Sequence, residues 1–162
     1  MKLNRDLDRY VDQALEQGRP VKIGWGRAGD ERPKDGEFGV LTHLPEGAKV
    51  LCLGNLGPLV GAANRGGTLT LRGSAGSMMA AFHVNGKTVV EKDVGDKAGY
   101  GMVGGEVSIQ GSCGNETGSS MDDGVLLVRG HAGDSLGCRM SGGTLIVMGS
   151  VGSEPGTGMT GG

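Results

Sequence analysis

Two segments of the sequence have the glycine spacing that cradles the phosphates of a dinucleotide. Gly99–Gly104 and Gly156–Gly161 both read GxGxxG. This pattern binds a pyrophosphate where it follows a strand and opens a helix. Both segments instead fall at positions that are glycine in other units of a repeat described below. We therefore predict turns at both places and no cofactor bound by this chain.

A third segment, Ala81–Thr88, approximates the phosphate-binding loop of nucleoside triphosphatases, with alanine in place of the first glycine. That loop needs a helix whose N-terminus faces the phosphates. The β-branched residues Thr88–Val90 predict a strand instead. A turn followed by a strand is therefore favoured over a nucleotide site.

The titratable residues form no pattern typical of catalysis or metal binding. His43, His83 and His131 have no acid or nucleophile at a characteristic spacing. Asp96 and Asp134 each follow a repeated glycine, but calcium-binding solenoids use a nine-residue repeat. We favour side chains that cap turns at these two positions. The sequence thus predicts no catalytic residue and no metal site.

The three cysteines lack the CxxC spacing of zinc and iron–sulfur sites. Their odd number also leaves at least one thiol without a disulfide partner. Cys52, Cys113 and Cys138 are therefore predicted to be buried thiols.

An internal repeat predicts the elements that would position any site. Glycine makes up 35 of the 162 residues, whereas aromatic residues make up 3%. Two columns of glycine recur with a 19-residue period and divide residues 49–162 into six units. We expect these glycines to be structural turns, where the backbone is left-handed or closely approached. They are Gly57, Gly76, Gly95, Gly114, Gly133 and Gly152, and Gly67, Gly86, Gly105, Gly124, Gly143 and Gly162.

Each unit also contains one short, strand-like aliphatic run. The first is Val50–Leu53, and its equivalent in the next unit is Leu69–Leu71. Residues two apart on a strand share a face, so aliphatic columns are predicted to point inward. They are Val50, Leu69, Thr88, Val107, Leu126 and Leu145; Cys52, Leu71, Val90, Ile109, Val128 and Val147; and Leu56, Ala75, Val94, Cys113, Ala132 and Val151.

A further inward column consists of methionine in the later units. Flexible thioethers fill irregular gaps in a core. The first two positions of the column are Asn64 and His83, so that end is more polar. The methionines are Met102, Met121, Met140 and Met159.

Self-similarity with a period of this length is typical of a solenoid, in which stacked units bury one another's apolar faces. We predict an all-β fold, a right-handed parallel β-helix of about six 19-residue coils over residues 49–162. Ordering the backbone of one isolated coil costs about 19 to 38 kcal/mol, at about 1 to 2 kcal/mol per residue. Its buried side chains return about 7 to 15 kcal/mol, so the coils are stable only when stacked.

Residues 1–48 form a second predicted unit, a short N-terminal α/β segment outside the 19-residue register. Apolar residues at helical spacing predict a helix over about 4–17, which Gly18 and Pro20 end. We expect this segment to cap the N-terminal end of the β-helix.

Three further elements are predicted in the rest of that segment. Val21–Trp25 is expected to form a strand and Gly26–Glu37 a loop, and Val40–Leu44 is expected to begin the stack. At the other end, no polar cap follows the last unit. The last coil is therefore expected to present unpaired backbone groups and an open apolar cross-section, to which another chain can bind. Either a partner covers this end, or the sequence is a truncated piece of a longer chain.

Charge and hydropathy argue against two classes of partner. The net charge is −2 and the charged residues are scattered, which is unlike the basic patch of a nucleic-acid-binding protein. No apolar run has the length that spans a membrane, and the N-terminus lacks the pattern of a secretory signal. We predict a cytoplasmic protein with no nucleic-acid or membrane partner.

Three segments of the aligned units resemble the GXGXG β-helix domain family: Leu71–Gly76, Gly99–Gly105 and Gly130–Gly137. That family includes the C-terminal domain of the glutamate synthase large subunit and the C subunit of formylmethanofuran dehydrogenase. The likeness covers about 49–162, and Ser74–Gly76 followed by Ala80–Phe82 looks more like the glutamate synthase branch. The resemblance implies a β-helix without a catalytic group. In that family it holds an amidotransferase domain and a flavin, iron–sulfur synthase domain in fixed relation.

Three hypotheses for function follow. The first is a non-catalytic scaffold in a glutamate synthase-like oxidoreductase assembly. Its partners are amidotransferase-like and FMN-binding chains, with FMN and iron–sulfur clusters in those chains and none in this one. The second is a component of a formylmethanofuran dehydrogenase or N-methylglutamate synthase complex, similar to the C subunit of the former. The third is a β-helix that self-associates through its open C-terminal coil.

Overall fold

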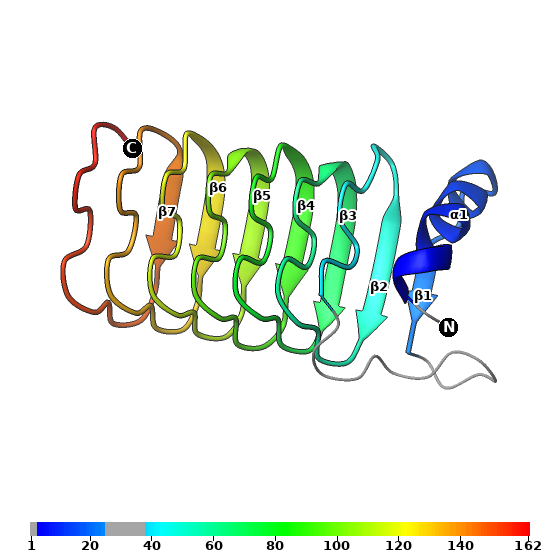
Figure 1. Ribbon diagram of the computed structural model, residues 1–162, viewed down its shortest axis with the longest axis horizontal. Coiled ribbons are helices and arrows are strands. Elements are labelled where there is room, and N and C mark those ends of the chain that lie inside the picture. The colour runs from blue at the N-terminus through cyan, green and yellow to red at the C-terminus, as the bar shows by residue number, and fades with distance from the viewer. Residues whose placement is uncertain (1–2, 25–37) are drawn as a thin grey trace.

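The computed structural model of the chain describes residues 3–24 and 38–162, with the side chains of the first range described from residue 9 onward. Trp25 and the predicted loop Gly26–Glu37 lie outside the described residues. The described chain winds into an elongated β-solenoid with one helix at its N-terminal end (Figure 1). The predicted fold class is confirmed.

One sheet of seven parallel strands runs along the solenoid, and strands consecutive in the chain are neighbours in the sheet. Figure 1 shows them side by side, with the rest of each turn running along one face of the sheet. The strands are β1 (Val21–Ile23), β2 (Lys49–Leu53), β3 (Arg65–Arg72), β4 (Asn85–Val90), β5 (Val103–Ile109), β6 (Asp123–Val128) and β7 (Thr144–Val147).

The register of the sheet confirms the 19-residue repeat. Val50 pairs with Leu69, Leu69 with Thr88, and this offset continues through to β7. The register shifts by one residue at the starts of β3 and β5, where Arg65 pairs with Asn85 and Val103 with Asp123. A second parallel ladder of isolated bridges runs from Leu56 to Val151 at the same offset. The number of turns is about five rather than six. Five turns lead from one strand to the next between β2 and β7, and no strand follows β7 in the described chain.

The core lies inside the coils. The predicted strand columns are buried from Val50 to Leu126 and from Cys52 to Val128, and their last members, Leu145 and Val147, are only partly buried. A further buried column escapes the sequence analysis, because its residues share no type. It consists of Val60, Met79, Ala98 and Thr117.

The helix α1 (Leu3–Glu16) lies at the N-terminal end of the sheet (Figure 1) and agrees with the predicted helix to within one residue at each end. Gly18, with φ of +61°, ends it: the amide of Gly18 donates to the carbonyl of Leu15, and the amide of Arg19 donates to that of Ala14. These two bonds form a Schellman motif. Within the described residues, no helix is both long and apolar enough to cross a membrane.

The N-terminal segment contributes a strand to the sheet of the solenoid, a pairing that the sequence did not predict. β1 pairs with β2, from Val21 to Val50, so it extends the sheet without following the 19-residue period. The predicted start of the stack at Val40–Leu44 agrees with the hydrogen bonds, because the amide of Gly61 donates to the carbonyl of Val40.

Candidate functional site

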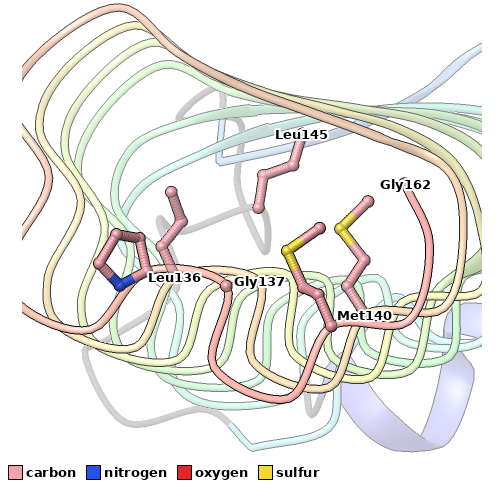
Figure 2. Close-up of a pocket in the computed structure, with 8 residues that line it drawn as sticks. Leu136, Gly137, Met140, Leu145 and Gly162 are labelled. Atoms are coloured by element: carbon pink, nitrogen blue, oxygen red, sulfur yellow. The ribbon is translucent and has the colours of Figure 1, made fainter.

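An apolar pocket of about 290 Å³ opens at the C-terminal end of the solenoid. Figure 2 shows Leu136, Met140 and Leu145 with their side chains directed into the same space inside the coils. Pro155 and Met159 also line it. In earlier turns the equivalent space is filled by the side chains of the turn that follows. The pocket is therefore the open cross-section that the repeat predicts.

The methionine column leads to this pocket. Met102, Met121 and Met140 are buried, whereas Met159 is 42% exposed and lines the opening. The difference follows from position, because no turn of the described chain covers Met159. Met102, Met121 and Met140 thus point into the core, as predicted, whereas Met159 lies at the opening of the pocket.

The sheet is also open at this end. Among the described strands, β7 is hydrogen-bonded only to β6, and the second ladder stops at Val151. An unpaired strand edge beside exposed apolar side chains is a surface on which another chain can add a strand. At this end the described residues therefore present β7 and apolar side chains that no other described residue covers.

The two glycine columns have different physical roles. At Gly76 a Cβ atom would lie 2.6 Å from the backbone nitrogen of Pro58 in the preceding turn, so this column allows adjacent turns to approach closely. At Gly124 the backbone is left-handed, with φ of +96°. The second column is left-handed in its later units, at Gly86, Gly105, Gly124, Gly143 and Gly162, but Gly67 has no positive φ.

A further left-handed column contains no glycine. Its φ values lie between +53° and +62°, a range that costs an L-residue about 1–2 kcal/mol. No residue type marks it, so the sequence gives no signal for it. It consists of Leu59, Met78, Lys97, Glu116, Ser135 and Glu154.

Asn64, His83 and Thr88 form a buried polar cluster at the N-terminal end of the methionine column. The Nδ1 atom of His83 lies 3.0 Å from the carbonyl oxygen of Gly104. Because a carbonyl oxygen only accepts, Nδ1 carries the proton. Nε2 then accepts from Asn64 Nδ2 at 3.3 Å and from Thr88 Oγ1 at 3.2 Å. The neutral ring therefore has a partner at both nitrogens.

Burial lowers the pKa of His83 below its ordinary value of 6.5, and the hydrogen bond to Gly104 acts in the opposite direction. A proton on Nε2 would face the amide hydrogens of Asn64, which also donate to the carbonyl of Gly67. The cluster therefore favours the neutral imidazole. The sequence indicates a polar end to the column but not this network.

Exposed side chains connect adjacent turns at the positions considered for calcium. Asp96 Oδ1 accepts from the amide of Asn115 at 2.8 Å, and Asn115 Oδ1 accepts from the amide of Asp134 at 2.9 Å. Asp134 Oδ1 accepts from the amide of Ser153 at 2.7 Å. Hydrogen bonds from the Ser153 amide and hydroxyl lower the pKa of Asp134. These carboxylates cap backbone amides of the next turn, as predicted.

The other two histidines are exposed. His131 belongs to a second row of the same kind, in which its Nδ1 accepts from the amide of Ser150 at 2.9 Å. His43 has a left-handed backbone with φ of +55°. Neither shares the buried environment of His83.

The cysteines follow the prediction in part. Cys52 and Cys113 are buried, and desolvation raises the pKa of the Cys113 thiol, whereas a hydrogen bond with Thr117 lowers it by a smaller amount. Cys138 is only partly buried. None of the three forms a disulfide within the described residues.

Two of the three phosphate-binding patterns are turns followed by strands, and Gly156–Gly161 lies beyond the last described strand, β7. Gly99–Gly104 leads into β5 and Ala81–Thr88 into β4, so neither opens a helix. In the described part of the chain, no three His, Cys, Asp or Glu side chains are grouped so that they could hold a metal ion.

The fold defines a class, a β-solenoid with one sheet of parallel strands. Comparisons of the chain with protein-family models, curated proteins and solved structures give no match.

Proposed function

We propose that this chain is a non-catalytic scaffold in a cytoplasmic, glutamate synthase-like oxidoreductase assembly. Its partners are an amidotransferase-like chain and an FMN-binding chain. FMN and iron–sulfur clusters belong to the partners, and catalysis takes place there. The resemblance of Leu71–Gly76 and Gly99–Gly105 to the GXGXG family supports this assignment.

The observation that carries the proposal is the constant register from β2 to β7. Every turn is hydrogen-bonded to the next along the sheet and along the second ladder. With neighbouring strands about 4.8 Å apart, five turns separate β2 from β7 by about 24 Å. Such a rod keeps two attached domains at one separation, which is what transfer of a reactive intermediate between two active sites requires.

The test is purification of the chain with an affinity tag from its native cells. We expect an amidotransferase-like chain and an FMN-binding, iron–sulfur chain to co-purify in fixed stoichiometry, with flavin and iron measured in the complex. Genes adjacent to this one that encode such chains would support the same assignment. The proposal is wrong if the co-purifying chains hold neither group, or if the chain is recovered alone.

A second candidate, self-association through the open C-terminal coil, is favoured by the unpaired edge of β7 and the pocket around Met140 and Leu145. A charge in the pocket tests it. Leu145→Lys is expected to abolish association if the pocket is the interface. The mass of the chain in sedimentation velocity is the measurement, and an unchanged mass excludes this candidate.

A further inference from the structure

Four apolar side chains form an exposed ridge on the side of the solenoid, away from both ends of the stack. Phe82, Val84 and Val103 are 51%, 48% and 44% exposed, and Tyr100 is partly buried. The rings of Phe82 and Tyr100 are in T-shaped contact, with centroids 5.6 Å apart. We call these four residues the Phe82 ridge.

The ridge spans two neighbouring turns. Val84 directly precedes β4 and Val103 opens β5, and these strands lie side by side (Figure 1). The amide of Val84 donates to the carbonyl of Asn64, and the amide of Val103 donates to that of His83. Each bond reaches the same position of the preceding turn, so the two valines occupy equivalent places one turn apart.

Opposite charges continue the same row at its two ends. Arg65, one turn before Val84, is exposed at the start of β3. Asp122, one turn after Val103, is also exposed, and its amide donates to the carbonyl of Met102, which is the equivalent bond one turn further on. Along the solenoid these equivalent positions therefore read positive, apolar, apolar, negative, although the strand register shifts by one residue at Arg65–Asn85 and at Val103–Asp123.

This order makes the row complementary to itself. A twofold axis between Val84 and Val103, perpendicular to the solenoid, places each valine of one copy against the other valine of a second copy. The same rotation places Arg65 of the first copy against Asp122 of the second, and Asp122 of the first copy against Arg65 of the second. Because a twofold interface is built from the same patch on both copies, it requires this kind of self-complementarity.

We propose that two copies of this chain form an antiparallel dimer through the Phe82 ridge, with reciprocal pairs between Arg65 and Asp122. Contiguous exposed apolar patches mark interaction surfaces, and the flanking charges fix the register of the two copies. Arg65 and Asp122 are three turns apart, or about 14 Å, so the reciprocal pairs lie on either side of the apolar centre. The patch is small, so the dimer is reversible.

The first experiment is sedimentation velocity of the full chain over a series of concentrations. We expect the wild-type mass to rise from monomer to dimer, and a high salt concentration to weaken the dimer. Val84→Asp is expected to raise the dissociation constant at least tenfold. Val125→Asp is the matched control, because Val125 is 40% exposed on β6 outside the ridge. Far-ultraviolet circular dichroism checks that each variant is folded.

The second experiment exchanges the charges. Arg65→Asp makes both ends of the row acidic, and Asp122→Arg makes both ends basic. We expect each variant alone to be largely monomeric, because like charges then face each other across the twofold axis. An equimolar mixture of the two variants is expected to dimerise, since every facing pair is again of opposite charge.

Three results would overturn the proposal: a wild-type chain that stays monomeric at every concentration, a Val84→Asp variant that dimerises like the wild type, or a mixture of the charge variants that stays monomeric. Dimerisation that survives Val84→Asp but not Leu145→Lys would assign association to the C-terminal pocket instead. None of these results bears on whether the chain co-purifies with an amidotransferase-like partner, so this inference and the scaffold proposal fail separately.

Discussion

At the scale of single residues, the buried polar cluster restricts how the first turns stack. Asn64, His83 and Thr88 belong to three successive units, and the carbonyl that His83 binds, that of Gly104, lies at the end of the third. A shift of any turn by one residue would leave a buried polar group without a partner, at a cost of about 1–3 kcal/mol. Asn64 and His83 occupy the first two positions of the methionine column. They thus stabilise the observed stacking register relative to registers shifted by one residue.

The same cluster makes stability depend on pH. The pKa of His83 is lower in the folded chain than in the unfolded one. The stability that depends on a neutral His83 is therefore fully present above pH 6.5. It is lost as the pH falls through that value, because the unfolded chain then binds more protons. We expect the free energy of unfolding, measured by urea denaturation, to fall by up to about 1.4 kcal/mol per pH unit as the pH falls below 6.5.

The matched variants are His83→Met, which extends the methionine column, and His131→Asn at an exposed position. We expect His83→Met to remove most of this slope and His131→Asn to leave it. A slope unchanged by His83→Met would show that another group is responsible.

A second residue-scale prediction concerns a glycine and the leucine it faces. Gly99 has φ of +65°, and a Cβ there would lie 2.9 Å from Cδ2 of Leu126. The equivalents of these two residues one unit earlier are Ala80 and the shorter Val107. We expect Gly99→Ala to cost about 1–3 kcal/mol and Leu126→Val about 1 kcal/mol.

Combined, Gly99→Ala and Leu126→Val are expected to cost at least about 0.5 kcal/mol less than the sum of the single changes. Thermal or urea denaturation of the four chains gives this difference. Strict additivity would contradict steric conflict as the reason for glycine at this position.

At the scale of elements, adjacent turns are connected by both backbone ladders and exposed side chains. Each Asx residue in the row of Asp96 accepts from the amide at the equivalent position of the next turn. Arg72 and Glu91 at 3.2 Å, and Lys87 and Glu106 at 2.8 Å, are ion pairs with the same offset. These pairs are exposed, so each contributes little by itself, and the ladders define the spacing of the turns.

The link from Asp134 to the last turn is acid-sensitive. Its pKa is lowered in the folded chain by the hydrogen bonds from Ser153, so the carboxylate favours the folded turn at pH values above 3.8. That contribution is lost as the pH falls through the folded pKa. We expect exchange of the Ser153 amide hydrogen, followed by NMR, to be faster in Asp134→Ala than in the wild type. In Asp134→Asn we expect protection to be retained, because Asn115 makes the same bond.

The elements also show what can be read from such a sequence. The strands of the solenoid and their inward columns followed from the 19-residue repeat, because identical positions recur in every unit. The helix followed from apolar residues at helical spacing. The buried column of Val60, Met79, Ala98 and Thr117 could not be predicted, because any small or apolar residue fits there. The pairing of β1 with β2 was also missed, since the step from Val21 to Val50 lies outside the repeat.

For the candidate site, periodicity predicted the methionine column. The hydrogen bonds of His83 depend on which side chains meet across turns, and the left-handed backbone at Lys97 or Glu116 leaves no mark in residue type. Both need coordinates. The Phe82 ridge likewise combines residues of two neighbouring turns, so it can be recognised only once the stacking of the turns is known.

At the scale of the whole molecule, the two ends of the rod differ. The N-terminal end bears α1, whose Val11 is buried, and the C-terminal end has a partly exposed core. Burial declines along the last turn, where Val151 and Met159 are exposed, although their equivalents in central turns are covered. Stability is therefore expected to be graded along the axis, as in other repeat architectures.

This gradient predicts an order of local opening. In hydrogen–deuterium exchange with mass spectrometry, peptides from residues 148–162 are expected to exchange first and those from 87–124 last. Leu145→Ala, in the last strand, should accelerate exchange at the C-terminal end while leaving the central turns protected. Uniform exchange along the rod would contradict a graded stability.

The constant offset between turns also restricts how the gene for such a chain can change in length. One inserted or deleted codon within a turn moves every later side chain out of its column, so inward positions turn outward and glycines leave the sites of close approach. Gain or loss of the codons for one whole unit returns each later residue to an equivalent slot. Unequal crossing-over between units is therefore a route by which this architecture lengthens or shortens in steps of one rung.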